Sequence, residues 1–325
     1  MKTERITLAH GNGGRYMREL IQETFISTFN NSFLNEMSDA AEIPAITSSI
    51  KITTDGYTVD PLIFPGGDIG KLSMCGTIND LVVSGAIPLY FTVNFFIEEG
   101  FEISLLKKIT HSMQKIAEEN SITIVAGDTK VLPRGAVNGL YIATTGIGNT
   151  VATHLSSKQI KTGNKIYTTG TLGDHGAAVL LARSEFGLTG PIISCCGSVL
   201  DIGKKLMQQT EVKFMRDPTR GGVATVCHEI IEETGIGITL FQNKLPIQEG
   251  VKSFCDILGF DPLYLASEGR IIFITDGNWQ PDNTLENIVE IGIIEATHTN
   301  LILETTIGGQ RIIPELEGDP LPRIC

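Results

Sequence analysis

Apolar residues in the first half of the chain follow helical and extended spacings in turn. A first helix is predicted where apolar residues recur three or four positions apart, at Met17, Leu20, Ile21, Phe25 and Phe29. A second predicted helix covers residues 103–116. Strands are predicted where apolar residues run together, at 50–54, 122–126 and 140–147. The uncharged stretch 81–97 predicts a helix end, a turn at 85–88 and a buried strand, so that helix 103–116 forms a crossover within one sheet.

The second half repeats the mixture of strands and helices in a new order. Strands are predicted at 165–169, 237–241, 270–275 and 291–296, and helices at about 174–186 and 199–208. A further amphipathic helix is indicated by the spacing of Val223, Val226, Cys227, Ile230 and Ile231. From Pro314 onward the prolines and glycines predict an exposed, extended tail. These patterns divide the chain into a lead with a glycine-rich loop (1–34), an α/β domain (35–152), an α+β domain (153–310) and a flexible tail (311–325).

Composition and charge restrict the class of protein. The 325 residues include 25 Lys and Arg against 37 Asp and Glu, a net charge of −12, which argues against general nucleic-acid binding. Hydrophobic residues make up 42% and charged residues 19%, as in a packed globular protein. Residues 1–20 lack the apolar core of a secretory signal, and the stretch 81–97 is too short and interrupted to span a bilayer. The expectation is a cytoplasmic protein without a membrane segment.

Six cysteines in a chain of this length do not make a disulfide framework. Cys75, Cys227 and Cys255 lie in apolar contexts and are expected to be buried, while the vicinal pair Cys195-Cys196 lacks the spacing of a zinc or redox site. Cys325 differs from these because it ends the sequence.

Two glycine-containing loops precede predicted helices. His10, Gly11, Asn12, Gly13 and Gly14 come directly before the first helix, where backbone N–H groups could approach an anion. Taken alone, this loop is more often a simple start of a helix. The run from Gly66 through Asp68 to Leu72 is close to a P-loop but lacks its first glycine and the Ser or Thr after Lys71.

Four aspartates follow or begin predicted elements: Asp55, Asp80, Asp128 and Asp217. Each alone is better explained as a helix cap or turn residue. As a set they suit Mg²⁺, which takes carboxylate oxygens and shares its remaining positions with phosphates.

The segment from Asp217 through Thr219 and Arg220 to Gly222 is the most specific of these motifs. It places a carboxylate, a hydroxyl, a guanidinium and two glycines directly before the helix that starts near Val223. Helix N–H groups and Arg220 together favour a phosphate there. Lys130 and Glu268 are candidates for proton transfer, although a surface lysine or a turn glutamate would look the same in the sequence.

Read together, these segments resemble the PurM-like, ATP-using synthetases, which include aminoimidazole ribonucleotide synthetase, selenophosphate synthetase and the carbamoyl dehydratases of hydrogenase maturation. Residues 77–88 (TINDLVVSGAIP) match the family signature, and AGDTKV and DPTRGG support it; the resemblance covers residues 5–325. The carbamoyl dehydratase branch is the nearest, on HGNGG at 10–14, TDGYTVDP at 54–61, FPGGDIG at 64–70 and PRIC at 322–325.

The resemblance implies a two-domain fold and a homodimer whose N-terminal sheets form a shared barrel, with residues 35–152 binding ATP and forming the dimer. It implies that a HypF-type carbamoyltransferase loads the thiol of Cys325, that ATP converts the carbamoyl group to a thiocyanate, and that a HypC–HypD complex receives the cyanide for the iron of [NiFe]-hydrogenase. Cys325, Lys130 and Glu268 are then catalytic. Mg²⁺ is assigned to Asp55, Asp80, Asp128 and Asp217. ATP is assigned to a larger set: His10, Gly11, Asn12, Gly13, Gly14, Asp55, Asp68, Thr77, Asn79, Asp80, Thr219, Arg220 and Gly221.

Three alternatives stay open at this point. A selenophosphate synthetase would be expected to carry a reactive cysteine in the N-terminal loop, yet no cysteine precedes Cys75. An aminoimidazole ribonucleotide synthetase has no use for a proline-rich tail ending in cysteine. A carrier without catalysis would have no need of the aspartates and the DPTRGG segment.

Overall fold

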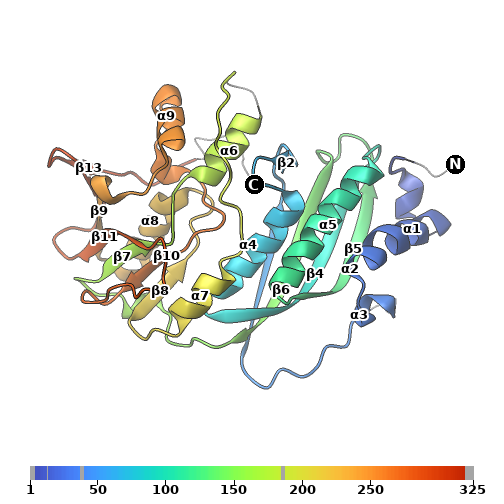
Figure 1. Cartoon of the computed structure of the whole chain (residues 1–325), viewed down its shortest axis with the longest axis horizontal. Coiled ribbons are helices and arrows are strands. Elements are labelled where there is room, and N and C mark those ends of the chain that lie inside the picture. The colour runs from blue at the N-terminus through green and yellow to red at the C-terminus, as the bar shows by residue number, and fades with distance from the viewer. Residues whose placement is uncertain (1–3, 13, 37–39, 184–186, 319–325) are drawn as a thin grey trace.

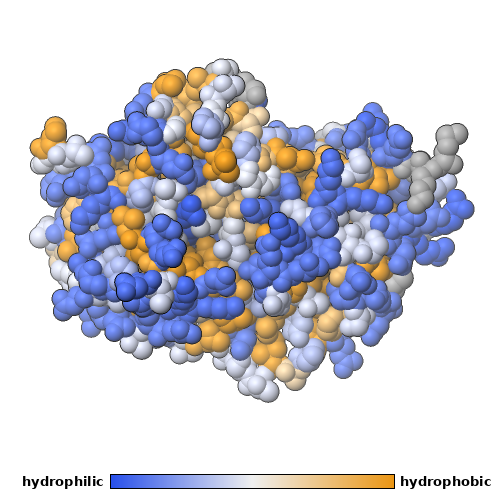
Figure 2. Space-filling model, in the orientation of Figure 1, coloured by the Kyte–Doolittle hydropathy of each residue, from blue (hydrophilic) through white to orange (hydrophobic). Residues whose placement is uncertain are grey.

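A computed structural model describes residues 4–12, 14–36, 40–183 and 187–318. The chain forms two mixed α/β halves that lie side by side, each built on its own sheet (Figure 1). Hydrophilic side chains cover most of the visible face, with apolar residues in smaller patches between them (Figure 2). No helix in the described part of the chain is long and apolar enough to cross a membrane.

The N-terminal half is a four-stranded sheet in the order β1-β6-β4-β5. Its strands are β1 (Ile50–Tyr57), β4 (Ala86–Glu98), β5 (Thr123–Leu132) and β6 (Leu140–Thr150). Helices α4 (Ile69–Val83) and α5 (Ile103–Glu119) cover one face (Figure 1). β4 and β5 are parallel with α5 between them, which confirms the predicted crossover. A short hairpin of β2 (Ile63–Phe64) and β3 (Gly67–Asp68) precedes α4.

The N-terminal lead lies beside β5, the edge strand of this sheet. It contains the 3-10 helix Leu8–Gly11, α1 (Arg15–Leu20), a π-helical turn at Ile21–Ile26, α2 (Ser27–Phe29) and α3 (Ser32–Asn35). The predicted first helix therefore exists, but a π turn interrupts its hydrogen-bond ladder.

The C-terminal half is a seven-stranded sheet in the order β13-β12-β9-β11-β7-β10-β8. Its strands are β7 (Lys165–Thr168), β8 (Val212–Arg216), β9 (Gly237–Phe241), β10 (Ile272–Thr275), β11 (Val289–Glu295), β12 (Leu301–Glu304) and β13 (Gln310–Ile312). Its helices are α6 (Asp174–Ala182), α7 (Leu200–Met207), α8 (Gly222–Thr234) and α9 (Glu249–Leu258). Single 3-10 turns lie at Ser157–Gln159, Gln242–Lys244 and Pro262–Tyr264.

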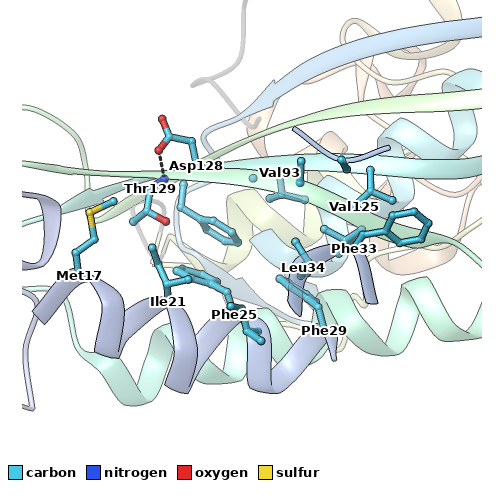
Figure 3. A pocket seen from close by; sticks show the side chains of 16 residues that line it. Met17, Ile21, Phe25, Phe29, Phe33, Leu34, Val93, Val125, Asp128 and Thr129 are labelled. Atoms are coloured by element: carbon cyan, nitrogen blue, oxygen red, sulfur yellow. Dashed lines mark hydrogen bonds between the residues drawn. The ribbon is translucent and has the colours of Figure 1, made fainter. Parts of the chain in front are cut away.

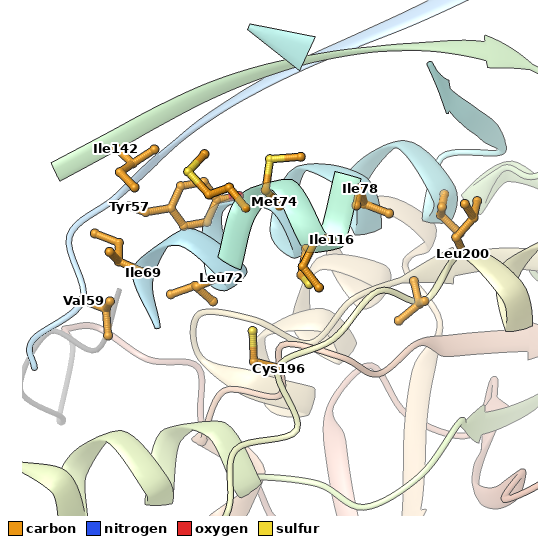
Figure 4. Packing of buried hydrophobic residues seen from close by; sticks show 14 of the residues in the cluster. Tyr57, Val59, Ile69, Leu72, Met74, Ile78, Ile116, Ile142, Cys196 and Leu200 are labelled. Atoms are coloured by element: carbon orange, nitrogen blue, oxygen red, sulfur yellow. The ribbon is translucent and has the colours of Figure 1, made fainter. Parts of the chain in front are cut away.

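One continuous core joins the two halves along α4. Leu72, Ile78, Cys196 and Leu200 belong to the same buried cluster, with α4 between the N-terminal sheet and the second half (Figure 4). Thirteen of the fifteen residues of α4 are buried, so the helix is apolar all round rather than amphipathic. Cys75, Cys227 and Cys255 are buried, as the apolar contexts predicted.

Several strands are longer than the apolar runs that predicted them. β1 continues to Tyr57 and β5 to Leu132, so Asp55, Asp128 and Lys130 lie on strands and not in the loops after them. The prediction ended these strands before Asp55 and before Gly127-Asp128, whereas a sheet with an open face accepts polar side chains at alternate positions. The predicted helix at 174–186 is shorter, ending at Ala182. Helix α9 and strands β8, β12 and β13 were not predicted.

Candidate active site

A polar cavity of about 510 Å³ lies where the two halves meet; we call it the junction pocket. Strand β1 supplies Asp55 and Tyr57, α4 supplies Asp80, and the loop before β10 supplies Glu268. Strand β8 ends in Arg216, and the segment between β8 and α8 supplies Asp217, Thr219 and Arg220. Residues separated by more than 200 positions in the sequence therefore line one cavity.

Asp80 is held at the pocket by a contact between α4 and β1. Its carboxylate accepts a hydrogen bond of 2.8 Å from the Oγ1 of Thr53. Burial raises the pKa of Asp80, and the charge of Asp55 adds to the increase, while Arg216 and Arg220 act against it. Burial and the neighbouring negative charge thus outweigh the effect of the two arginines on this carboxylate.

Asp217 experiences the stronger perturbation. Its side chain is only 6% exposed. Burial, followed by repulsion from Asp80, raises the pKa of Asp217 from 3.8 to about 7. A buried and a half-buried carboxylate that disfavour each other's ionisation make a site that gains from a bound cation.

The start of α8 forms the basic wall of the pocket. Gly221 has a left-handed backbone, with φ of 71°, and turns the chain into the helix directly after Arg220. Arg216 contacts Glu229 of α8 at 3.2 Å, and its Nε is buried without a hydrogen-bond partner among the described residues. A helix N-terminus with two arginines beside it suits phosphate.

Glu268 is buried, with 3% of its surface exposed, and its position depends on Asn79 of α4. The Asn79 amide donates to the carbonyl oxygens of Glu268 and Gly197, each at 3.1 Å, and its oxygen accepts from the N–H of Val199 at 2.9 Å. Asn79 itself is fully buried and does not line the pocket. It ties α4 to the loop that carries Glu268.

Thr77, one turn earlier on α4, is also fully buried beneath the pocket. Its hydroxyl contacts the hydroxyl of Tyr57 at 3.2 Å and that of Thr144 more closely. Burial raises the pKa of Tyr57 well above its usual value, so the phenol remains protonated. Within this chain Thr77 and Asn79 therefore support the pocket walls, although the sequence pattern placed both on ATP.

A second group of predicted residues lies apart, at β5. Lys130 forms an ion pair with Asp128 at 2.9 Å, and this contact lowers the pKa of Asp128. Across the sheet Asp55 pairs with Thr144, Thr144 with Val93, and Val93 with Gly127, so that Asp55 and Gly127 are three strand spacings apart. At about 4.8 Å per strand, their backbones are about 14 Å apart. One copy of the chain therefore does not bring Asp128 and Lys130 to its own junction pocket.

The glycine-rich loop belongs with this second group. The ring Nδ1 of His10 accepts from the N–H of Thr7 at 3.0 Å, which closes the first turn. A Cβ on Gly11 would lie 2.9 Å from the Cβ of Val131, so the loop packs tightly on β5. Asn12 and Gly14 flank Gly13, which lies outside the described residues, as does Cys325.

Asp68 has a local role in the structure. Its carboxylate accepts from the N–H of Lys71 at 3.0 Å and caps α4, while the Lys71 Nζ donates to the carbonyl of Gly66 at 2.9 Å. Asp68 and Lys71 thus fix the turn before α4 and its first residues.

An apolar cavity of about 240 Å³ separates the N-terminal helices from β5 (Figure 3). Met17, Ile21, Phe25 and Phe29 line one side and Val93 lies opposite, with Asp128 at one end. Its lining has few groups that could hold a nucleotide, and it is separate from the junction pocket.

Among the described residues, no three Asp, Glu, His or Cys side chains lie close enough together to hold one metal ion by themselves. Sequence reasoning missed Tyr57 and Arg216 as pocket residues. Arg216 directly precedes the DPTRGG segment, so its place next to that motif was the available signal.

Comparison with known proteins gives full-length matches. Residues 37–150 match the family described as AIR synthase related protein, N-terminal domain, and residues 161–298 match the corresponding C-terminal domain. The carbamoyl dehydratase HypE of Rhodobacter capsulatus is 38% identical over 340 residues, covering 100% of this chain and 99% of that protein.

Two solved structures extend the comparison to three dimensions. A crystal structure of the hydrogenase maturation protein HypE in complex with ATP has a TM-score of 0.91 at 36% identity and covers 98% of this chain and 99% of the other. A HypE chain from a crystal structure of a HypE–HypF complex has a TM-score of 0.79 at 40% identity, covering 91% and 99%.

Proposed function

The chain belongs to the AIR synthase related family, in which its full-length relatives are HypE carbamoyl dehydratases, and we propose that it performs their reaction. In this reaction ATP drives the dehydration of a carbamoyl group on the thiol of Cys325 to a thiocyanate. The thiocyanate supplies cyanide for the iron of [NiFe]-hydrogenase. The expected fold, PurM-like with two α/β halves, is confirmed by the structure and by its likeness to HypE.

The observation that carries this proposal is the junction pocket. It combines three aspartates, two arginines and a helix N-terminus with Glu268, a buried carboxyl group outside the phosphate-binding elements. ATP binding alone would not require Glu268 at the wall of the cavity. A carrier without catalysis would require neither ATP binding nor Glu268.

The chemistry divides between these groups. A primary carboxamide loses water poorly because its oxygen is a poor leaving group, and transfer of the γ-phosphoryl group to that oxygen converts it into a phosphate. Arg216, Arg220 and the N–H groups at the start of α8 stabilise the phosphate charge. The carbamoyl nitrogen loses one proton when its oxygen is phosphorylated, which gives an iminophosphate, and a second proton when phosphate leaves, which gives the nitrile. Glu268 accepts these protons in turn and passes the first to solvent before it takes the second.

Mg²⁺ fits the acidic wall of the pocket, because the high pKa of Asp217 reflects an uncompensated buried charge there. Asp55, Asp80 and Asp217 line that wall without converging on one point, so one or two of them would hold the ion together with ATP phosphates. When bound, it would neutralise charge on the phosphates.

We further propose that the chain forms a homodimer and that Lys130 and Asp128 act in the junction pocket of the second copy. Strands β1 and β5 each have a partner on one side only among the described residues. A shared barrel would pair these edges and would carry the β5 residues toward another pocket. The glycine-rich loop with His10 and Gly11 would follow them.

The partners follow from the reaction. A HypF-type carbamoyltransferase loads the thiol, and the crystallised HypE–HypF complex supports this contact. A HypC–HypD complex is the proposed acceptor of cyanide.

The test uses the full chain after incubation with the carbamoyltransferase, carbamoyl phosphate and ATP. Intact-mass spectrometry should record a carbamoyl adduct on Cys325 that loses one water when Mg-ATP is present. Glu268→Gln should hold the adduct without losing water. An adduct that stays unchanged in the wild-type protein would refute the proposed activity.

A further inference from the structure

The last described segment of the chain, residues 313–318, does not leave the domain freely. Ile313 is fully buried and its N–H donates to the carbonyl of Leu301 at 2.9 Å, which continues the contact of β13 with β12. Burial of this apolar side chain fixes the point where the tail begins.

Two side chains then hold successive carbonyl groups. The Nε2 of His228, on α8, donates to the carbonyl of Ile313 at 3.1 Å. The hydroxyl of Tyr264 donates to the carbonyl of Pro314 at 2.7 Å. Burial and the charge of Asp261 raise the pKa of Tyr264, which keeps this hydroxyl protonated as a donor.

A third contact follows two residues later. Leu316 is half-buried, and its Cδ1 would lie 3.3 Å from a Cβ placed on Gly221, the residue that caps α8. Gly221 follows Arg220 of the junction pocket, and Thr225, which the same Cβ would also meet, lines that pocket. The tail thus passes beside the elements that carry the basic wall.

The same elements carry Glu268. The first turn of α8 packs against residues 263–265, because a Cβ on Gly222 would lie 2.5 Å from the carbonyl oxygen of Leu263. Tyr264 is four residues before Glu268. His228 and Tyr264 therefore belong to the two elements that position Arg220 and Glu268.

We infer that His228 and Tyr264, with Gly221 as the third contact of Leu316, form a seat that fixes the base of the tail beside the junction pocket. The inference rests on the proposed function. His228 and Tyr264 are positioning residues, since they act on the reaction through the tail and touch neither the carbamoyl group nor ATP.

The seat fixes the point from which the chain continues toward Cys325. Nine residues lead from Leu316 to Cys325, and at about 3.3 Å each they span at most about 30 Å. A short arm fixed at the rim of the pocket keeps its thiol at an effective concentration of about millimolar or above. An arm released at Ile313 is longer, so the thiol reaches the pocket less often.

The test separates the two reactions of the Cys325 thiol, which are loading by the transferase and dehydration in the junction pocket. In a His228→Met, Tyr264→Phe double variant, carbamoyl loading by the transferase should continue at the wild-type rate, because loading needs only an accessible arm. Single-turnover dehydration of the loaded thiol should slow by about five- to 150-fold, the range for losing two hydrogen bonds. ATP affinity, measured by calorimetric titration, should not change.

His228→Gln provides the matched control, because it keeps an N–H donor and should restore dehydration toward the wild-type rate. Equal dehydration in the double variant and the wild type would overturn the inference, and so would a parallel loss of ATP affinity or of loading.

A second measurement tests whether the seat holds the base of the tail, and it does so even if the wild-type protein fails to dehydrate the adduct. A glutamate-specific protease should cut at Glu315, between the two carbonyl contacts and Leu316, several-fold faster in the double variant than in the wild type. Cleavage at Glu119, at the end of α5, serves as the internal reference. Equal cleavage at Glu315 would refute the seat, whereas an inactive wild type with a protected Glu315 would refute only the proposed function.

Discussion

Replacing Asp217 by asparagine should make the ligand-free protein more stable and at the same time weaken its binding of Mg-ATP. The pKa of Asp217 is about 7 in the folded protein, against 3.8 for a free aspartate, because burial and Asp80 disfavour its charge. Between these two pH values the folded protein holds a proton that the unfolded chain has lost. The free energy of unfolding therefore falls as pH rises from about 4 to about 7.

The magnitude follows from the pKa difference. At 1.36 kcal/mol for each pKa unit, the ionisation of Asp217 costs the folded state up to about 4 kcal/mol above pH 7. Asp217→Asn removes that charge at nearly constant volume. We expect it to raise the free energy of unfolding by about 1–4 kcal/mol at pH 8 and to change it little at pH 4, where the aspartate is already protonated in the fold.

The assay is urea unfolding of the ligand-free protein at pH 4, 6 and 8 and at one protein concentration, with calorimetric titration of Mg-ATP at pH 8. Affinity should fall about tenfold or more, because a charged ligand to the cation is lost. Asp256→Asn, on the exposed face of α9, makes the same change in net charge and should leave both measurements unchanged. An Asp217→Asn variant no more stable than wild type at pH 8 would show that the carboxylate is already compensated.

Four further results are expected. Asn79→Ala should lower the free energy of unfolding by about 2–4 kcal/mol in urea titrations, since it leaves buried backbone groups without partners. It should also impair dehydration more than ATP binding, and full dehydration activity would contradict the role of Asn79 in holding Glu268. Glu268→Gln should retain ATP affinity by calorimetry and slow dehydration by about 10²- to 10⁴-fold. Lys130→Ala should be inactive alone. Mixing it with Glu268→Gln and re-equilibrating the subunits should restore about a quarter of the activity, because half the dimers are mixed and each of these has one intact site of two. No recovery of activity in the mixture would argue against a site shared between subunits. Cys325→Ala should give no carbamoyl adduct in intact-mass spectra, and an adduct of wild-type yield would assign the acceptor elsewhere.

The sequence by itself determined the local elements and the chemical types of the pocket residues. The spacing of apolar residues predicted α5, α8 and the crossover between β4 and β5, because a helix or strand must bury one face and its period shows in the sequence. The segment from Asp217 to Gly222 predicted a phosphate site for a local reason as well, because a carboxylate, an arginine and two glycines stand close together in the sequence directly before a helix.

Only the tertiary structure decided which of these residues meet. Asn79 stands next to Asp80 in the sequence, but on a helix adjacent side chains point about 100° apart, so Asp80 faces the pocket while Asn79 faces the loop of Glu268. The order β1-β6-β4-β5 puts Asp55 and Lys130 at opposite edges of one sheet, which no periodicity reveals. Strand order and the contact between the two halves depend on interactions between distant segments, and a pattern read along the chain holds no information about distances across it.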